Sequence, residues 1–139
     1  MGRVVGYVLA LTLLGTSDAS AECPWSPEDA NDNAKILAHQ ECKEAEIRKA
    51  EQGFMHAEIA VSQRIKALYD IVPERDRLQV VARQRAWERA SEACPPPNNG
   101  LMKTPERFAC LEQDYWNRAE LLDALIAECR AGTCDLGKL

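Results

Sequence analysis

The sequence is poor in the residues that form most catalytic and metal sites. It has only two histidines, His39 and His56. On one helix these would lie about 25 Å apart, too far to share a metal ion. No Cys-x-x-Cys, Gly-rich phosphate loop, Gly-x-Ser-x-Gly or His-Glu-x-x-His is present. Catalysis needs a positioned nucleophile or base with an orienting group, and nothing nominates one. We therefore expect no enzyme activity, no metal site and no cofactor.

The chain also has no apolar run long enough to cross a bilayer. Its longest, residues 4–14, is far below the roughly 20 residues that a membrane-spanning helix needs. Arg3 precedes this run and Ala-Ser-Ala at 19–21 follows it, which resembles a secretory signal peptide. We expect residues 1–21 to be removed and 22–139 to form one helical domain, without membrane insertion. An uncleaved anchor is the alternative.

A basic excess is missing as well. The formal net charge is −5 at pH 7, and it stays at −5 without the leader, which contains only Arg3 and Asp18 as charged residues. Nucleic acids and anionic lipids bind basic patches, so neither is an expected partner. The acidic balance instead favours a cationic protein partner.

What the sequence does have is six cysteines, all downstream of the leader: Cys23, Cys42, Cys94, Cys110, Cys129 and Cys134. In an exported domain they indicate disulfides, and hence a periplasmic or secreted protein. Six cysteines allow 15 pairings. Helix geometry favours Cys129 with Cys134 across a Gly-containing turn and Cys94 with Cys110 across a loop, which leaves Cys23 with Cys42. A zinc or redox site is the alternative use of these thiols.

The composition and the spacing of apolar residues predict helices. Aromatic residues make up 6% of the chain, and Ala, Glu, Arg and Gln are abundant, which suits helices more than sheets. A first helix is predicted from about residue 34 to Val72, where Pro73 disfavours helical backbone at the preceding residue. Its apolar residues form one stripe: Ile47, Phe54, Val61, Ile65, Leu68 and Val72.

Two further helices follow. The second is predicted from Pro73 or Glu74 to about Cys94, with Val80, Trp87 and Cys94 recurring every seven residues. The third begins with Thr104 as its N-cap and ends before Gly132. The predicted fold class is all-α, an antiparallel three-helix bundle with a long first helix. That helix would be about 58 Å long, too long for the third to cover. It must project, bend near Gly53 or meet another chain.

A proline-asparagine segment separates the second and third helices. Its residues oppose helix and favour extended backbone followed by a turn: Pro95, Pro96, Pro97, Asn98, Asn99 and Gly100. With Lys103 it is a candidate partner-binding loop, held at its base by Cys94 and Cys110. The alternative is a plain connector.

Gln84-Arg85-Ala86-Trp87, followed seven residues later by Cys94, resembles the Q-R-A-W…C signature of the lysozyme inhibitor LprI-like family. The resemblance extends over about residues 23–126, through Cys23, Cys42, Leu68-Tyr69 and Phe108-Ala109-Cys110-Leu111, with Arg118 and Leu122 in the same helix. The chain departs from the family pattern at Ile65-Lys66-Ala67 and Ser91-Glu92-Ala93, and Cys129 and Cys134 look like an added pair.

The resemblance implies an exported, largely helical bacterial protein, and the family name implies lysozyme inhibition. An acidic protein suits a basic enzyme electrostatically, and Lys103 on the loop could offer a cation to lysozyme's catalytic carboxylates. The alternative function is a structural or assembly factor of the cell envelope. It would act through helix–helix contacts of the exposed half of the first helix, with Ile47 and Phe54, and could be a homodimer. Trp87 is expected to be a core anchor. Arg85 is expected either to bond within the fold or to be solvated.

Overall fold

The structure, a computed structural model, describes residues 23–92, 94 and 103–139. The predicted leader therefore lies outside the described residues. The helices, α for α-helix and η for 3-10 helix, run in the order η1 (Pro27–Asn31), α1 (Asn33–Ile71), η2 (Glu74–Asp76), α2 (Arg77–Ser91), α3 (Pro105–Arg130) and η3 (Leu136–Lys138). The predicted all-α class with three main helices is confirmed.

The bounds of α1 follow from its two ends. At the start, the Asp32 carboxylate accepts hydrogen bonds from the backbone N–H groups of Ala34 and Lys35, at 3.0 and 3.3 Å. These are donors that a helix N-terminus leaves without an intrahelical partner. At the other end, Val72 is extended (φ −76°, ψ 151°), as a residue before proline prefers. Between these ends α1 is continuous through Gly53.

The third helix begins as predicted, whereas the second differs from its prediction at both ends. The 3-10 helix η2 occupies Glu74–Asp76, so α2 begins only at Arg77, and it also ends earlier than predicted. Thr104 caps α3: its hydroxyl accepts from the Arg107 N–H at 3.1 Å. After α3, Gly132 has φ +84°, a left-handed conformation that glycine adopts without strain. The second helix was predicted to continue to about Cys94, yet α2 stops at Ser91, and the N–H of Cys94 bonds the Ser91 carbonyl in a turn.

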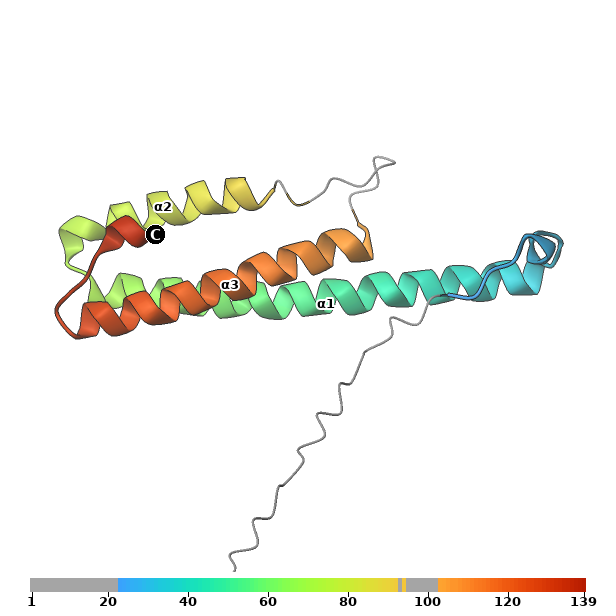
Figure 1. Cartoon of the computed structure of the whole chain (residues 1–139), viewed down its shortest axis with the longest axis horizontal. Coiled ribbons are helices and arrows are strands. Elements are labelled where there is room, and N and C mark those ends of the chain that lie inside the picture. The colour runs from blue at the N-terminus through green and yellow to red at the C-terminus, as the bar shows by residue number, and fades with distance from the viewer. Residues whose placement is uncertain (1–22, 93, 95–102) are drawn as a thin grey trace, which may run out of the picture.

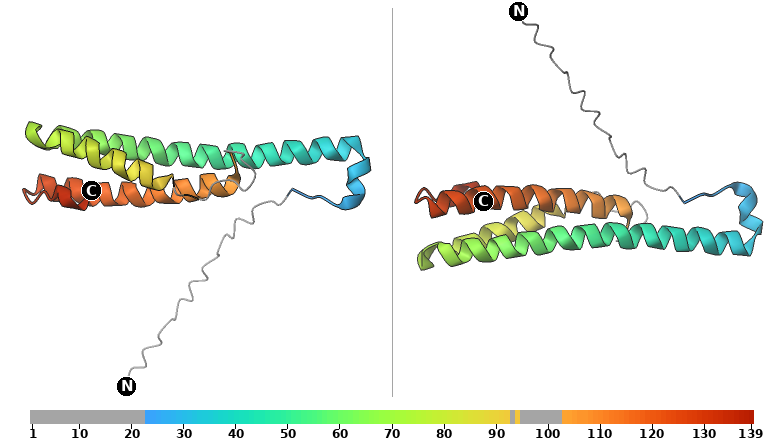
Figure 2. Two further views of the ribbon diagram at one scale, coloured as in Figure 1. Left: turned by 90° about the horizontal axis from the view of Figure 1, so that it is seen from above. Right: turned by 90° about the horizontal axis from the view of Figure 1, so that it is seen from below.

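The helices run up, down and up, so α2 is antiparallel to both α1 and α3 (Figure 1). Helix α3 lies along α1 and makes most of its interhelical contacts with it, whereas α2 makes few. Views from above and below show α1 continuing well past the start of α3 (Figure 2). The ion pair between Lys103 and Glu51, at 2.8 Å, lies where the N-terminal end of α3 contacts α1. Residues 33–50 of α1 therefore project, one of the three predicted possibilities.

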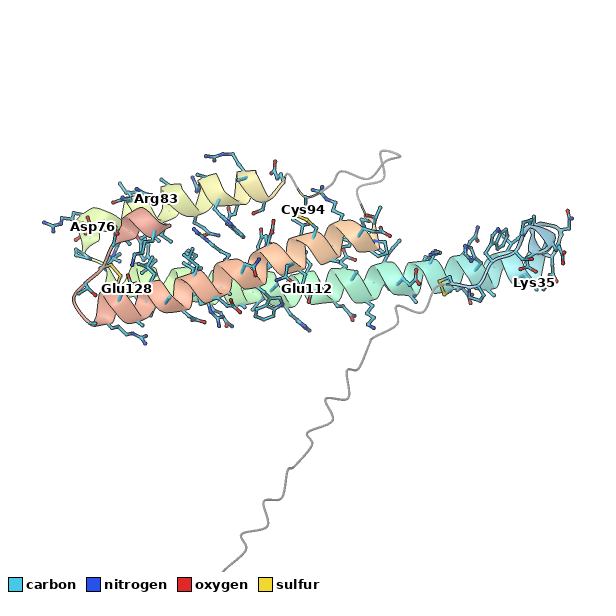
Figure 3. All side chains as sticks on the ribbon, in the orientation of Figure 1. Lys35, Asp76, Arg83, Cys94, Glu112 and Glu128 are labelled. Carbon is cyan, nitrogen blue, oxygen red and sulfur yellow. A yellow bond between two sulfur atoms is a disulfide. The ribbon has the colours of Figure 1, made fainter. Side chains whose placement is uncertain are left out.

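The side chain of Glu112 from α3 reaches the backbone of α1 at Gly53. A Cβ atom at this position would collide with the carboxylate of Glu112, which α3 directs onto α1 (Figure 3). The next residue, Phe54, packs against Phe108 and Tyr115, and its ring centroid lies 6.0 and 5.1 Å from theirs. Phe54 was predicted to lie on the exposed half of the first helix. That prediction was wrong, because the covered part of α1 begins just before it.

The hydrophobic core lies toward the C-terminal ends of α1 and α3. Its buried members come mainly from these two helices, with one from α2 and one from η3: Val61, Leu68, Val72, Val80, Ala119, Leu122, Leu125, Ile126 and Leu136. Each large member contributes about 1.5–3 kcal/mol by leaving water. The C-terminal segment lies beside α2, where the Arg83 guanidinium donates to the Gly137 carbonyl at 3.3 Å. Because α2 gives the core only Val80, it is the least firmly packed of the three helices.

All six cysteines are paired, in the combination that their spacing favours. The bonds are Cys23–Cys42, Cys94–Cys110 and Cys129–Cys134, with Cα–Cα distances of 5.7, 5.8 and 3.9 Å. The first fixes the N-terminal segment to α1, the second joins the end of α2 to α3, and the third closes the turn after α3. None of the helices in the described ranges has both the length and the hydropathy of a membrane span.

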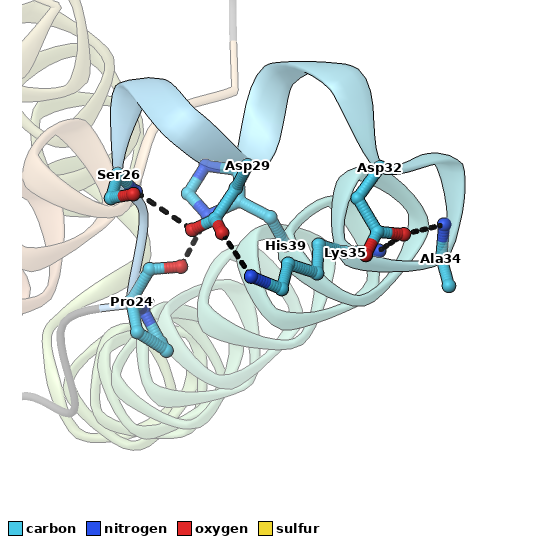
Figure 4. Close-up of polar contacts among 7 residues, drawn as sticks. All are labelled: Pro24, Ser26, Asp29, Asp32, Ala34, Lys35 and His39. Atoms are coloured by element: carbon cyan, nitrogen blue, oxygen red, sulfur yellow. Dashed lines mark hydrogen bonds and ion pairs between the residues drawn. The ribbon is translucent and has the colours of Figure 1, made fainter.

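The N-terminal segment forms a small cap on the projecting end of α1 (Figure 4). The Trp25 and His39 rings lie 4.8 Å apart, and His39 Nδ1 is 3.3 Å from the Pro24 carbonyl oxygen. The Asp29 carboxylate accepts from the Ser26 N–H and pairs with Lys35. The hydrogen bond from Lys35 is the main reason that the pKa of Asp29 is lowered. Together with the Cys23–Cys42 bond, these contacts give the projecting end its own local structure.

Candidate functional site

A groove of about 530 Å³ lies between the three helices, because α2 stands away from the α1–α3 pair. Its lining includes apolar side chains from α1 and α3: Phe54, Val61, Ile65, Leu111 and Tyr115. Ligand-binding clefts typically have volumes of about 300–1,000 Å³. The groove is therefore large enough to receive side chains of another molecule.

Three of the four charged residues that line the groove in the described part of the chain are acidic. Glu58 comes from α1, Glu88 from α2 and Glu92 from the residue after α2, and they face one cation, Arg107 of α3. The Arg107 guanidinium donates to the Cys94 carbonyl at 3.1 Å. Among the ion pairs within the described ranges, none involves any of these three glutamates. The groove thus presents a surplus of negative charge beside apolar surface.

The pKa of Tyr115 reflects the apolar and acidic surroundings in the groove. Its ring contacts the rings of Phe54 from α1 and Trp87 from α2, at centroid distances of 5.1 and 4.8 Å. Burial raises the pKa of the Tyr115 hydroxyl, and the charges of Glu88, Glu58 and Glu92 raise it further. The three carboxylates that line the groove therefore act on the same point and disfavour negative charge there.

Next to the groove, a buried arginine joins α2, α3 and the C-terminal segment. Arg118 is 4% exposed and Gln84 6%. The Nε and Nη2 atoms of Arg118 donate to Gln84 Oε1 at 3.2 and 3.1 Å, and Nη1 donates to the Leu139 carbonyl at 3.0 Å. Gln84 also donates from Nε2 to Glu88, at 3.2 Å. The network satisfies groups whose unpaired burial would be costly.

Trp87 completes the surroundings of Arg118. The guanidinium carbon lies 5.1 Å from the centroid of the Trp87 ring, within the range of a cation–π interaction. Burial lowers the pKa of Arg118, an effect that Glu88 opposes. An arginine keeps its charge at all ordinary pH values, so the protein holds a buried cation between Gln84, Trp87 and Leu139.

The four signature residues divide into two pairs. Gln84 is buried in the arginine network, and Trp87 is partly buried, packing against the core rather than forming its centre. Arg85 and Ala86 are exposed on the other side of α2. Of the two expectations for Arg85, the structure agrees with the solvated one.

The predicted binding loop, residues 95–100, lies outside the described residues. Lys103, at its C-terminal side, pairs with Glu51 of α1 at 2.8 Å while remaining largely exposed. Its ammonium group already has an intramolecular partner, so a lysozyme carboxylate would compete with Glu51 for it. The structure does not bring Lys103 to the groove, whose cation is Arg107.

Two carboxylates lie beside cysteine sulfurs: Glu46 near Cys23 and Cys42, and Asp114 near Cys94 and Cys110. In both groups the sulfurs are bonded to each other. Metal binding by cysteine requires the thiolate, which a disulfide does not provide. The arrangement of the cysteines is thus that of structural cross-links.

Comparison with protein-family models, with curated proteins and with solved structures finds no match to this chain. The resemblance to the LprI-like family therefore stays a prediction, based on the signature residues and on the further sequence features within residues 23–126.

Sequence reasoning missed the groove acids and the role of Arg118. A signal for Arg118 was present: it lies three residues after Tyr115 and four before Leu122, within the apolar stripe of α3. Gln84 is placed similarly on α2, four residues after Val80 and three before Trp87. A polar residue on each of two facing stripes is the pattern of a buried polar pair. The groove had no comparable signal, because it depends on how far α2 stands from its neighbours.

Proposed function

We propose that this chain is an extracytoplasmic binding protein, without enzyme activity, whose partner is a cationic protein. The observation that carries the proposal is the acidic, partly apolar groove between the three helices. Oppositely charged surfaces speed association and select partners. Three disulfides support a periplasmic or secreted location, since such bonds persist in oxidising compartments.

The specific activity that we propose is inhibition of a lysozyme. Its support is the resemblance of Gln84-Arg85-Ala86-Trp87 and Cys94 to the LprI-like signature. Within the fold, Gln84 and Trp87 hold Arg118 and so fix α2 relative to α3. In this proposal the signature residues maintain the scaffold, and recognition belongs to the charged surface beside them.

A lytic assay tests the proposed activity. The mature, oxidised protein should slow the lysis of bacterial cell walls by at least one cationic lysozyme, because the acidic protein associates with the basic enzyme. The effect should weaken as salt is added, since exposed charges are screened over about 10 Å at 0.1 M ionic strength. The reduced and alkylated protein is the control. Unchanged lysis rates across several lysozyme types at low salt would contradict the proposal.

A second function, assembly of envelope structures through helix–helix contacts, is favoured by the projecting part of α1. Ile36 and Ile47 lie there, on the same face of α1 as Phe54, and extend its apolar stripe beyond the start of α3. Helix α3 begins at Pro105, close to Glu51 of α1, so it does not cover this part of the stripe, where Ile36 and Ile47 are partly exposed. A second chain could pack against it.

Light scattering separates this second function from the first. If α1 pairs with a second copy, the mature protein should have the mass of a dimer, and Ile47→Glu should convert it to a monomer by placing a charge in the apolar contact. Ile59→Glu, at a half-exposed position on a different face of α1, is the matched control and should leave the dimer intact. A monomer at all concentrations would exclude the homodimer.

A further inference from the structure

The groove combines two properties that together specify its occupant. One is apolar surface that includes the rings of Phe54 and Tyr115, and the other is the set of carboxylates of Glu58, Glu88 and Glu92. A neutral apolar segment would bury the carboxylates without an opposite charge, and only Glu88 has a hydrogen-bond donor, Gln84, in the described part of the chain, so the burial would be costly. An anionic segment would be repelled. A long side chain with an apolar stem and a cationic head satisfies both properties.

The positions of the charged residues further restrict the kind of side chain that the groove can bind. The three glutamates come from two sides of the groove, α1 and the C-terminal end of α2, so its negative charge is not confined to one helix. Among the described residues of the lining, Arg107 is the only cation, and its guanidinium donates to the Cys94 carbonyl at 3.1 Å. Within the described part of the chain, Arg107 forms no ion pair with the three glutamates, and three carboxylates against one guanidinium leave the lining with a net negative charge.

We infer that the groove between α1, α2 and α3 receives a basic segment of the partner protein, with an arginine or lysine side chain placed between Glu58, Glu88 and Glu92. The inference rests on the proposed function, and it adds the place and the chemistry of recognition. The stem of the basic side chain lies along the apolar lining, and its cationic head pairs with the carboxylates. Guanidinium groups pair well with carboxylates, because they donate two parallel hydrogen bonds.

A hexa-arginine peptide carrying a fluorophore is the direct probe, with hexa-citrulline as its neutral, nearly isosteric counterpart. Fluorescence anisotropy with the full mature protein should detect binding of hexa-arginine and none of hexa-citrulline. In the triple variant E58Q/E88Q/E92Q the dissociation constant should rise about tenfold, since each pair contributes modestly. Glutamine keeps the size of each side chain, and at position 88 it keeps an acceptor for Gln84.

The matched control removes the same number of charges elsewhere. The triple variant E41Q/E44Q/E120Q changes three exposed glutamates that do not line the groove. Its dissociation constant should rise less than about threefold, because it loses only long-range attraction that salt screens. Arg107→Gln tests the opposite change of charge, because it makes the groove more negative. Removing the groove cation should tighten hexa-arginine binding by about two- to threefold.

Equal losses in the two triple variants would overturn the inference, because binding would then follow net charge rather than the groove. Self-association that the groove triple abolishes would overturn it as well, since the occupant would be a second copy of this chain. If the groove triple still inhibits lysozyme as the unchanged protein does, the groove inference fails while the proposed function stands. If hexa-arginine binds the groove but no lysozyme is inhibited, the groove inference stands and the lysozyme proposal fails.

Discussion

Replacing Arg118 with methionine should lower the free energy of unfolding by about 2–4 kcal/mol. Methionine keeps the apolar length of the side chain but cannot donate to Gln84 Oε1 or to the Leu139 carbonyl. Each buried acceptor that loses its donor costs about 1–3 kcal/mol. The contact of the guanidinium with the Trp87 ring is lost as well.

The converse substitution, Gln84→Leu, should cost about 2–3 kcal/mol, since it leaves a buried guanidinium with two unpaired N–H groups. The double variant Q84L/R118M should cost less than the sum of the two by at least about 1 kcal/mol. Its two apolar side chains face each other, and neither leaves the other unpaired. The non-additivity is the distinctive expectation, because two independent packing defects would add.

Urea unfolding followed by circular dichroism measures all three variants, with comparable m-values as the sign that the compared states are the same. Arg85→Met is the matched control. It is the neighbouring arginine of the same helix, but it is exposed, so its effect should stay within about 0.5 kcal/mol. Additivity within about 0.5 kcal/mol in the double variant would show that Arg118 and Gln84 do not form a coupled pair.

The helices could be predicted because their signals are local. Pro73 ends α1 through its effect on Val72, and Thr104 starts α3 through one hydrogen bond to Arg107. The end of α2 was misjudged because the seven-residue spacing from Val80 through Trp87 to Cys94 continues beyond the helix. Cys94 lies in a turn instead, where the proline that follows disfavours helical backbone.

The relative positions of the helices were harder to predict than their existence. Phe54 was assigned to an exposed surface because the register of α3 on α1 is not encoded in the apolar stripe of α1. That register depends on contacts across the chain, such as the pair of Lys103 with Glu51 and the approach of Glu112 at Gly53. The groove depends on the same relation, since it exists only because α2 stands away from the other two helices.

Removing the Cys94–Cys110 bond, in the double variant C94A/C110A, should lower the free energy of unfolding by about 3 kcal/mol. The bond closes a loop with a sequence separation of 16, and a loop of this size restricts the unfolded chain by about that amount. In C129A/C134A, where the separation is 5, the loss should be smaller, about 2 kcal/mol. The order of these two values tests whether the bonds act through the unfolded chain.

The native state gives the Cys94–Cys110 bond a second role. Helix α2 gives the buried core only Val80. Its other contacts are those of Gln84 and Trp87 with Arg118, of Trp87 with the Tyr115 ring and of Arg83 with the Gly137 carbonyl. We therefore expect amide hydrogen exchange in C94A/C110A to increase first in residues 77–91 and much less in α1 and α3, since local opening follows the least packed element. C129A/C134A, which removes a bond outside α2, is the control and should leave exchange in 77–91 nearly unchanged. Uniform loss of protection across the three helices would mean that α2 is held by its packing, and that the disulfide stabilises the fold only as a whole.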